Sequence, residues 1–382
     1  MQCQKFNEGW TFEKVDGDDR LKAFYGEKKA VSVTLPHDAM IREKREKDCP
    51  AGAQSGFYPG GVYSYEKSFF APEEWKEQDV VLEFEGIYGT AKVWINGALA
   101  AVNRNGYMGF LIDLKPWIRY GEKNQLKVDA DNSNQPDSRW YSGAGIYRDV
   151  NLWTGRGVYV PHDKLRVTTL SVRDEMAVLE VCAELKNRTG QGKEAECLAE
   201  IILDGKTIAT EKQRVVFYSD QTEVVRMQIP VSRPEKWSPD HPALYECRMK
   251  TSIDHEICDV TSETFGIRVL SLVPVHGFQI NGETVKLRGA CIHHDNGVIG
   301  AETFPEAEWY RCKRLKEAGF NAIRSAHHPM SRAMLDACDH IGMLVMDELT
   351  DMWNRSKNPY DFSGIFQEEA GQWISHMVKK DY

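Results

Sequence analysis

The sequence predicts a multidomain protein: an all-β jelly-roll sandwich, then an immunoglobulin-like β-sandwich, then the first three β/α units of a TIM (β/α)8 barrel. Three observations predict this fold class. The chain has 382 residues, which suits two or three domains better than one. Short alternating strands separated by Gly, Pro and Asn turns continue to about residue 268. After about residue 270, strands alternate with segments of helical period.

The jelly roll is predicted over residues 1–155. GVYSYEKSFF alternates bulky and polar positions, two strands surround Gly86 to Gly89, and Asn96-Gly97 is a strong type I′ hairpin signal. No segment here has a convincing helical period, so many short strands at regular spacing favour a sandwich or jelly roll.

The second sandwich is predicted over residues 157–268. Its alternating strands include AVLEVCAELKN and ECLAEIILDGKTIATE, and Asp204-Gly205 marks a hairpin. About seven strands in this length are typical of an immunoglobulin-like sandwich, and the lack of a Cys–Trp–Cys frame excludes an antibody-type domain.

The partial barrel is predicted over residues 269–382. VKLRGACIH, FNAIRSAH and MLVMDEL are predicted strands, and helical segments follow them, one starting after a Ser331 N-cap and ending before Gly342. The strands are continuously apolar, which is typical of a parallel sheet buried on both faces. A complete (β/α)8 barrel typically needs about 250 residues, so only its first part is expected here.

Composition excludes several classes of protein. The net charge is −9 and no basic run occurs, which argues against a nucleic-acid or anionic-membrane partner. No apolar run approaches the roughly 20 residues that cross a bilayer, and the N-terminus lacks the apolar region of a signal peptide. Nine cysteines are scattered without a CxxC pair. We therefore expect reduced thiols in a cytoplasmic protein, with no zinc site.

Polar side chains follow each predicted strand of the barrel. In such barrels, binding and catalytic residues lie at the C-terminal ends of strands, so these side chains predict the floor of one pocket. They are His293, His294 and Asp295, then Arg324, His327 and His328, then Asp347, Glu348, Asp351 and Trp353.

Each of these residues also has a structural interpretation. A single strand-end His can be structural, and Arg324 can pair with a core carboxylate. The His-His-Asp run could ligate a metal, but adjacent strand residues point to opposite sides and do not converge. For the same reason only one of Asp347 and Glu348 can face the pocket. The same polar character at three strand ends favours the functional interpretation.

The whole chain resembles glycoside hydrolase family 2, the β-galactosidase and β-glucuronidase group, in the family's domain order. SRWYSGAGIYR and DMWNRSKNPYDF look most like the β-galactosidase branch. The other matching stretches are PGGVYSYEKSFF, VWINGALA, KWSPDHPALYECR, FGIRVL, VKLRGACIHHDNG, GFNAIRSAHHPMS and MLVMDELTDMW.

The resemblance implies retaining hydrolysis of a terminal β-glycosidic bond by two glutamates, whose carboxyls lie roughly 5–5.5 Å apart. In the family, the acid/base lies in a Gly-Asn-Glu segment after the fourth barrel strand and the nucleophile on the seventh. No Asn-Glu pair occurs after residue 300. We therefore expect both glutamates beyond Tyr382, no catalytic residue in this chain, and no turnover by the chain alone. Glu348, on the third strand, matches neither role.

The resemblance also implies roles for other residues. Arg324 matches an arginine that hydrogen-bonds the nucleophile, and His327 matches a histidine that contacts the sugar. Asn132, Arg139 and Trp140 lie in a jelly-roll loop that reaches the family's active site, although Trp140 could equally pack in a core. The predicted substrate-binding or supporting residues are Arg324, His327, His294, Asp347, Glu348, Asn132, Arg139, Trp140 and Trp353.

The expected partner is a carbohydrate, a β-galactoside or a related β-glycoside. No cofactor or metal is expected in this chain, while the resemblance leaves open a divalent or monovalent cation in a full-length enzyme, and a homo-oligomer. Two alternatives remain: β-glucuronidase or β-mannosidase specificity within the family, and a non-catalytic carbohydrate-binding or scaffold protein.

Overall fold

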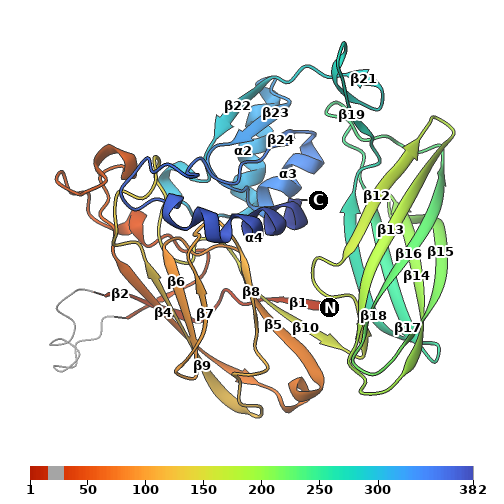
Figure 1. Cartoon of the computed structure of the whole chain (residues 1–382), viewed down its shortest axis with the longest axis horizontal. Helices are drawn as coiled ribbons and strands as arrows, with labels where there is room; N and C mark the ends of the chain where they lie inside the picture. The colour runs from red at the N-terminus through yellow and green to blue at the C-terminus, as the bar shows by residue number, and fades with distance from the viewer. Residues whose placement is uncertain (16–29, 382) are drawn as a thin grey trace.

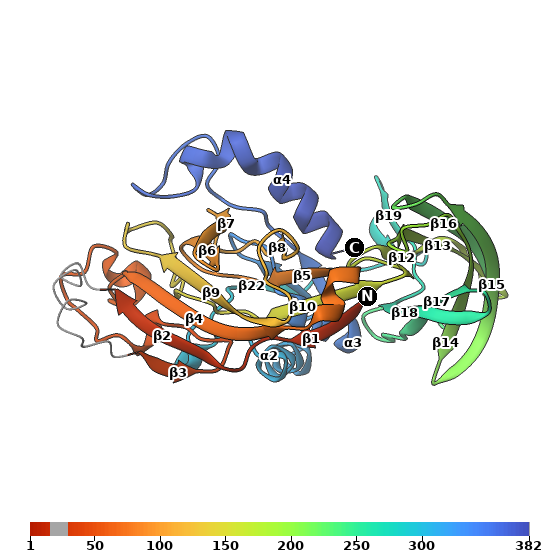
Figure 2. The same ribbon diagram turned by 90° about the horizontal axis from the view of Figure 1, so that it is seen from below.

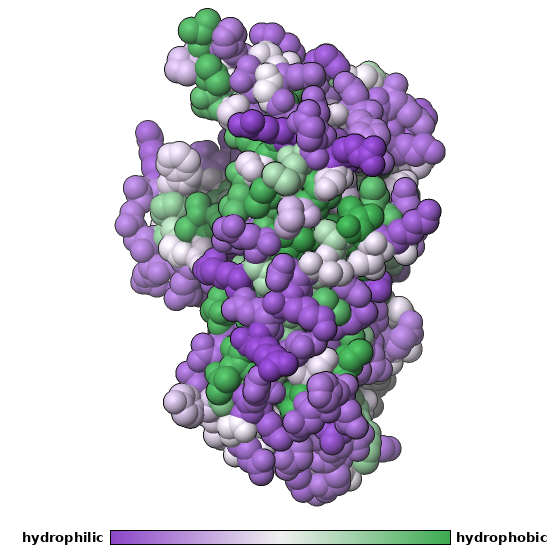
Figure 3. Space-filling view, turned by 90° about the vertical axis from the view of Figure 1, so that its right-hand side faces the viewer, coloured by the Kyte–Doolittle hydropathy of each residue, from purple (hydrophilic) through white to green (hydrophobic). Residues whose placement is uncertain are grey.

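The computed structural model describes residues 1–15 and 30–381 and confirms the predicted fold class. In Figure 1 the first β-sandwich lies at the lower left, the second at the right, and the β/α units above the first. Figure 2 shows the same left-to-right order from below. Seen from its right-hand side, the molecule has hydrophobic residues gathered near mid-height, with mostly hydrophilic residues above and below them (Figure 3).

The first sandwich pairs a four-stranded sheet with a six-stranded sheet across one apolar core. Alternate strand residues point into this core, so Ala91, Val93 and Ile95 are buried while their neighbours face outward. Asn96 and Gly97 connect β6(Thr90–Ile95) to β7(Ala98–Asn103) in the predicted hairpin. The first sheet has the order β1(Gln2–Lys5)-β10(Val150–Arg156)-β5(Gln78–Phe84)-β8(Phe110–Asp113). The second has the order β3(Val31–Val33)-β2(Trp10–Val15)-β4(Val62–Ala71)-β9(Glu122–Asp131)-β6(Thr90–Ile95)-β7(Ala98–Asn103).

The second sandwich has two antiparallel sheets of longer strands. Its core is a separate apolar cluster that includes Leu179, Val181, Ile201 and Met249. In one sheet β13(Met176–Asn187) lies between β12(Leu165–Val172) and β16(Thr222–Ser232) and also pairs with β11(Val158–Tyr159). The other has the order β15(Lys206–Phe217)-β14(Lys193–Leu203)-β17(Tyr245–Ile253)-β18(Glu256–Phe265).

The third part contains a parallel sheet and the α-helices of the described residues. A small antiparallel sheet, β19(Leu270–Val273)-β20(Gly277–Ile280)-β21(Glu283–Thr284), precedes it. The Ser331 hydroxyl caps α3 by accepting from the Met334 amide at 3.2 Å, as predicted. The parallel order is β22(Gly289–Ile292)-β23(Ala322–Ser325)-β24(Leu344–Met346), with helices α2(Pro305–Glu317), α3(Arg332–Ile341) and α4(Ser363–Asp381). Short 3₁₀ turns are η1(Met40–Arg42), η2(Gly52–Ser55), η3(Glu73–Glu77) and η4(Gly297–Ile299).

The parallel strands are buried on one face within the described residues, although their apolar character is typical of strands buried on both. Ile323 and Val345 pack in a cluster with Cys312 of α2 and Met334 of α3. The alternate residues point the other way, where Met346 is 58% exposed. The sheet is therefore covered on its helical face, and its other face is open within the described parts of the chain.

A tight contact joins the second sandwich to the β/α units. Trp237 is almost fully buried and donates from Nε1 to the Asp339 carbonyl of α3 at 2.9 Å. The Pro239 carbonyl accepts from Lys316 Nζ at 2.5 Å. Gly342, just after α3, has φ of +81°, and a Cβ there would lie 2.2 Å from the Pro239 oxygen. The position therefore requires glycine for both conformation and space.

We predict that Gly342→Ala destabilises the chain much more than Gly282→Ala. Gly282 also has a positive φ, +86°, but a Cβ there meets nothing within 4 Å. The control variant should lose only the stability that a left-handed conformation costs a residue with a Cβ, about 1–2 kcal/mol. Gly342→Ala should lose more, because its Cβ also clashes with backbone. Urea unfolding of both variants measures the difference, and equal losses would contradict this account of the contact.

Candidate functional site

An open cavity of about 840 Å³ lies at the C-terminal ends of the parallel strands. Arg324 of β23 and Glu348, just after β24, form one side of it. Asp351 and Trp353 come from the following loop, and Phe366 from α4. The cavity is where the strand-end rule for barrels places a binding site. We call it the strand-end cleft.

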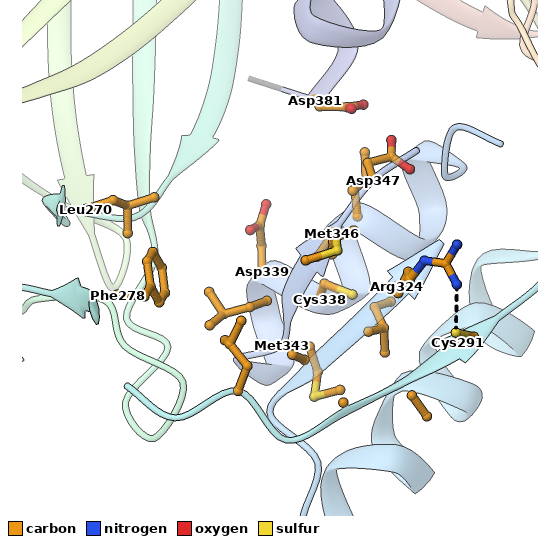
Figure 4. A pocket seen from close by; sticks show the side chains of 18 of the residues that line it. Leu270, Phe278, Cys291, Arg324, Cys338, Asp339, Met343, Met346, Asp347 and Asp381 are labelled. Carbon is orange, nitrogen blue, oxygen red and sulfur yellow. Dashed lines mark hydrogen bonds between the residues drawn. The ribbon is translucent and has the colours of Figure 1, made fainter. Parts of the chain in front are cut away.

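Glu348 and Arg324 form an ion pair on one side of this cleft. One Glu348 oxygen accepts from Arg324 Nε, and the other accepts from the His327 backbone amide at 2.8 Å. Burial disfavours the Glu348 carboxylate, but these two donors outweigh it and lower the pKa of Glu348. Arg324 Nη1 also lies 3.1 Å from the Cys291 sulfur (Figure 4). Glu348 therefore stays ionised and fixes the direction of the guanidinium.

Arg139 of the jelly-roll loop contacts Asp351, which lines this cleft. Arg139 Nη2 lies 2.5 Å from Asp351 Oδ2 and 3.2 Å from His327 Nε2. Trp140 stacks on the His293 ring, with centroids 4.2 Å apart and planes 7° apart. Its Nε1 donates to Asp295 Oδ1 at 2.8 Å. Trp140 is 46% exposed, so the alternative of core packing does not hold.

His327 has an unusual backbone and a defined protonation state. Its φ is +81°, a conformation that residues with a side chain seldom adopt and that often marks functional sites. Burial lowers the pKa of its imidazole, the nearby Arg139 lowers it further, and Asp351 opposes both. Because a guanidinium has no acceptor, Nε2 must accept from Arg139, which puts the proton on Nδ1. His327 is therefore a neutral ring at the cleft.

His294, by contrast, does not face the cleft, which corrects its predicted placement. Its Nε2 lies 2.8 Å from the Ser142 carbonyl oxygen, and its Nδ1 lies 3.2 Å from His328 Nε2. Tyr107 stacks on His328 and meets the His294 ring edge-on. Burial lowers the pKa of His294 to about 4. This neutral, buried histidine holds the jelly-roll loop against the β/α units.

Asn132 and Asp347 also lie away from the cleft, while Trp353 lines it. Asn132 is buried in the jelly roll, where its amide donates to the Gly143 carbonyl at 3.1 Å. Asp347 points to the opposite side of β24 from Glu348, as strand alternation requires. Trp353 is 63% exposed and donates to the Thr350 carbonyl at 2.8 Å.

Asp347 lines a second cavity, of about 700 Å³, on the open face of the parallel sheet. Figure 4 shows Leu270 and Phe278 on one side of this cavity, with Asp347 and Asp381 near its top. The Met330 amide donates to Asp347 at 3.0 Å. Burial, and then the neighbouring Asp381, raise the pKa of Asp347 to about 7.

Asp295 and Asp351 have partners that the sequence does not reveal. Both were recognised only as strand-end carboxylates, yet they hold Trp140 and Arg139 of the jelly-roll loop. Trp140 and Asp295 are 155 positions apart in the chain. No local pattern signals a pairing at that separation. Across residues 1–15 and 30–381, no group of three His, Cys, Asp or Glu side chains is arranged to hold a metal ion.

A loop of the first sandwich thus reaches the strand ends of the β/α sheet, in a chain of two β-sandwiches followed by β/α units. Three models of one family match the chain in succession. The sugar binding domain of glycosyl hydrolases family 2 matches residues 53–155, a further domain of that family matches 158–268, and its TIM barrel domain matches 273–377. The chain belongs to glycosyl hydrolases family 2.

Similar proteins include both galactosidases and glucuronidases. Beta-galactosidase BoGH2A of Bacteroides ovatus is 34% identical over 98% of this chain, and a putative beta-glucuronidase of Formosa agariphila is 32% identical over 97%. The chain spans 44% and 35% of these two relatives. Among solved structures, a family 2 member from Bacteroides cellulosilyticus has a TM-score of 0.92 at 32% identity, over all of this chain and 50% of that one. A beta-glycosidase from Bacteroides vulgatus has a TM-score of 0.90 at 31% identity, over all of this chain and 49% of that one.

We predict that Asp347→Asn becomes more stabilising, relative to the native chain, as pH rises from 5 to 8. The folded-state pKa of about 7 lies above the usual value of 3.8, so the native chain loses stability as pH rises through this window. Asparagine removes the titration. Thermal unfolding across the pH range measures the difference, with Asp254→Asn as the exposed control. A pH-independent difference for Asp347→Asn would contradict the raised pKa.

Proposed function

We propose that this chain supplies the sugar-recognition side of the active site of a retaining β-glycosidase, with a β-galactoside as the leading substrate. The observation that carries the proposal is the meeting of Arg324, His327 and Glu348 with the loop of Arg139 and Trp140 in one cleft. Membership of the family supports hydrolysis as the reaction class. A relative named as a beta-galactosidase supports the substrate.

The residues of the cleft suit binding and orientation. A guanidinium fixed by Glu348 can hold a neighbouring carboxylate ionised and oriented, which is the role proposed for Arg324. The neutral His327 ring can exchange hydrogen bonds with sugar hydroxyls. Trp353 and Trp140 offer flat apolar surfaces for the carbon face of a sugar ring.

Glu348, Asp351 and Asp295 lack the setting of a general acid. Asp347, whose pKa is raised to about 7, lines the other cavity, on the opposite side of β24. Glu348 is bound by Arg324, Asp351 lies between Arg139 and Lys357, and Asp295 accepts from Trp140. A general acid must hold a proton near neutral pH, and Glu348, whose pKa is lowered, does not. We therefore propose that the catalytic glutamates lie outside these 382 residues.

Two alternatives have specific support. β-Glucuronidase specificity is favoured by relatives carrying that name, such as the one from Formosa agariphila; β-mannosidase specificity has no such support. A non-catalytic, carbohydrate-binding role is favoured by the pairing of the strand-end carboxylates. The proposal includes a cytoplasmic location, which nine free cysteines support, and a role in carbohydrate metabolism. No helix of the described residues has the length and apolar character to cross a membrane.

We predict that the purified 382-residue chain does not hydrolyse 4-nitrophenyl β-galactoside or β-glucuronide. Loss of general acid catalysis alone typically costs about 10²–10⁴-fold in rate, and the covalent route also needs a nucleophile. Nitrophenolate release measures turnover, with an active family 2 β-galactosidase as the positive control. Release that falls at least a hundredfold in Glu348→Gln would instead put the acid inside this chain.

We also predict self-association through the open face of the parallel sheet. Leu270, Leu287 and Met346 are each at least half exposed there, and such apolar surface favours association. Met346→Glu should shift the chain toward monomer in light scattering after gel filtration. Ile257→Glu, an equally exposed position on the second sandwich, is the control. A native chain that is monomeric at high concentration would contradict this prediction.

A further inference from the structure

Trp94 lies on the outer face of the six-stranded sheet of the jelly roll. Its neighbours along β6, Val93 and Ile95, point into the core, so the indole must point outward. Pairing between strands puts Leu99 of β7 on one side of Trp94 and Lys127 of β9 on the other. Glu66 of β4 follows Lys127 in the same row.

A shallow hollow of about 390 Å³ lies over this row, lined by Glu66, Trp94, Gly97, Gln125, Leu126 and Lys127. The Lys127 Nζ lies 5.4 Å from the centre of the Trp94 ring and 3.4 Å from Asp129. The hollow shares no residue with the strand-end cleft. In Figures 1 and 2 its sheet faces away from the second sandwich. Neither packing in the core of a sandwich nor a role in the strand-end cleft explains why the Trp94 indole faces outward.

We propose that this hollow binds one neutral sugar unit of a β-linked oligosaccharide. A sugar ring has an apolar face of C–H groups and a rim of hydroxyls. The indole supplies a flat apolar floor for the first. Gln125 and Lys127 can donate to the second, and Glu66 can accept from it. This set matches a hydroxyl-rich ligand on both counts.

Charge favours a neutral ligand over an ionic one. Lys127 and Glu66 are directly opposite each other on paired strands, so the hollow has no net charge from its lining. An anionic ligand such as a phosphate would meet the Glu66 carboxylate, and a cationic ligand would meet the Lys127 ammonium. A neutral sugar can accept a hydrogen bond from Lys127 and donate one to Glu66, and neither charge repels it.

A second sugar contact would raise the concentration of substrate at the cleft. A glycan held at the jelly roll stays tethered to the molecule, so the next binding event becomes intramolecular. The choice of a sugar as the ligand rests on the proposed function, while the position of the hollow does not. The proposed function and this inference are tested separately, because the strand-end cleft and the hollow each have their own variant.

The test is calorimetric titration of the chain with β-1,4-linked galactotetraose and β-1,4-linked glucotetraose. Trp94→Ala should weaken binding at least about tenfold, and Trp94→Phe should restore part of it. Trp309→Ala removes a part-exposed indole from α2 and should change nothing. His327→Ala, in the strand-end cleft, should leave this binding intact. Thermal unfolding checks that each variant is folded.

Loss of binding in His327→Ala with retention in Trp94→Ala would overturn the inference and leave the proposed function standing. If neither tetrasaccharide binds, the inference is overturned as well. A measurement on the native chain guards against misfolded variants. Bound tetrasaccharide should protect Lys127 from acetylation, read by peptide mass spectrometry, and unchanged labelling at saturating sugar would overturn the inference.

Discussion

The buried carboxylate of Asp38 is the interaction on which the site depends. Its oxygens accept five hydrogen bonds: Met40 N at 2.9 Å, Ile41 N at 3.4 Å, Ala144 N at 3.1 Å, Tyr141 OH at 2.6 Å and Ala301 N at 2.8 Å. Burial raises the pKa of Asp38 even against these donors. Three segments of chain, two from the jelly roll and one following β22, thus converge on one group. An unsatisfied buried hydrogen-bonding group costs about 1–3 kcal/mol. Displacing any one of the three segments from Asp38 would therefore destabilise the folded chain.

This convergence explains how a loop of one domain reaches the cleft of another. Tyr141 follows Arg139 and Trp140 directly, so holding Tyr141 fixes where those two side chains begin. Gly300 makes room for the arrangement, since a Cβ there would lie 2.3 Å from an Asp38 oxygen. Buried Arg148 adds a second tie, donating to the carbonyls of Tyr107 at 3.1 Å and Pro329 at 3.3 Å. The jelly roll and the β/α units are therefore joined by buried polar contacts as well as by the aromatic cluster of Tyr88, Tyr107 and Tyr147 with Ala301.

The sequence predicts local features well and these contacts poorly. Period-two strands, the Asn96-Gly97 hairpin and the Ser331 cap all follow from short segments, and all are present. Strand alternation also separates Asp347 from Glu348 correctly. The placement of His294 fails for another reason, because its partner, the Ser142 carbonyl, lies 152 positions away and no local pattern signals it. Asp38 gives no signal, since its partners lie more than 100 positions away at Tyr141 and Ala301.

The charges in the cleft bear on which sugar it accepts. Arg324 is committed to Glu348, and Arg139 and Lys357 are both committed to Asp351. Taking one of these cations for a substrate carboxylate would weaken a protein ion pair, although Asp351 would keep a second cation. Arg355 also lines the cleft, and no carboxylate of the described residues pairs with it. A neutral sugar needs no exchange, because it binds through hydroxyls to groups that stay paired. The paired charges of the cleft thus suit recognition through hydroxyls, while Arg355 leaves one cation that a substrate carboxylate could contact without an exchange.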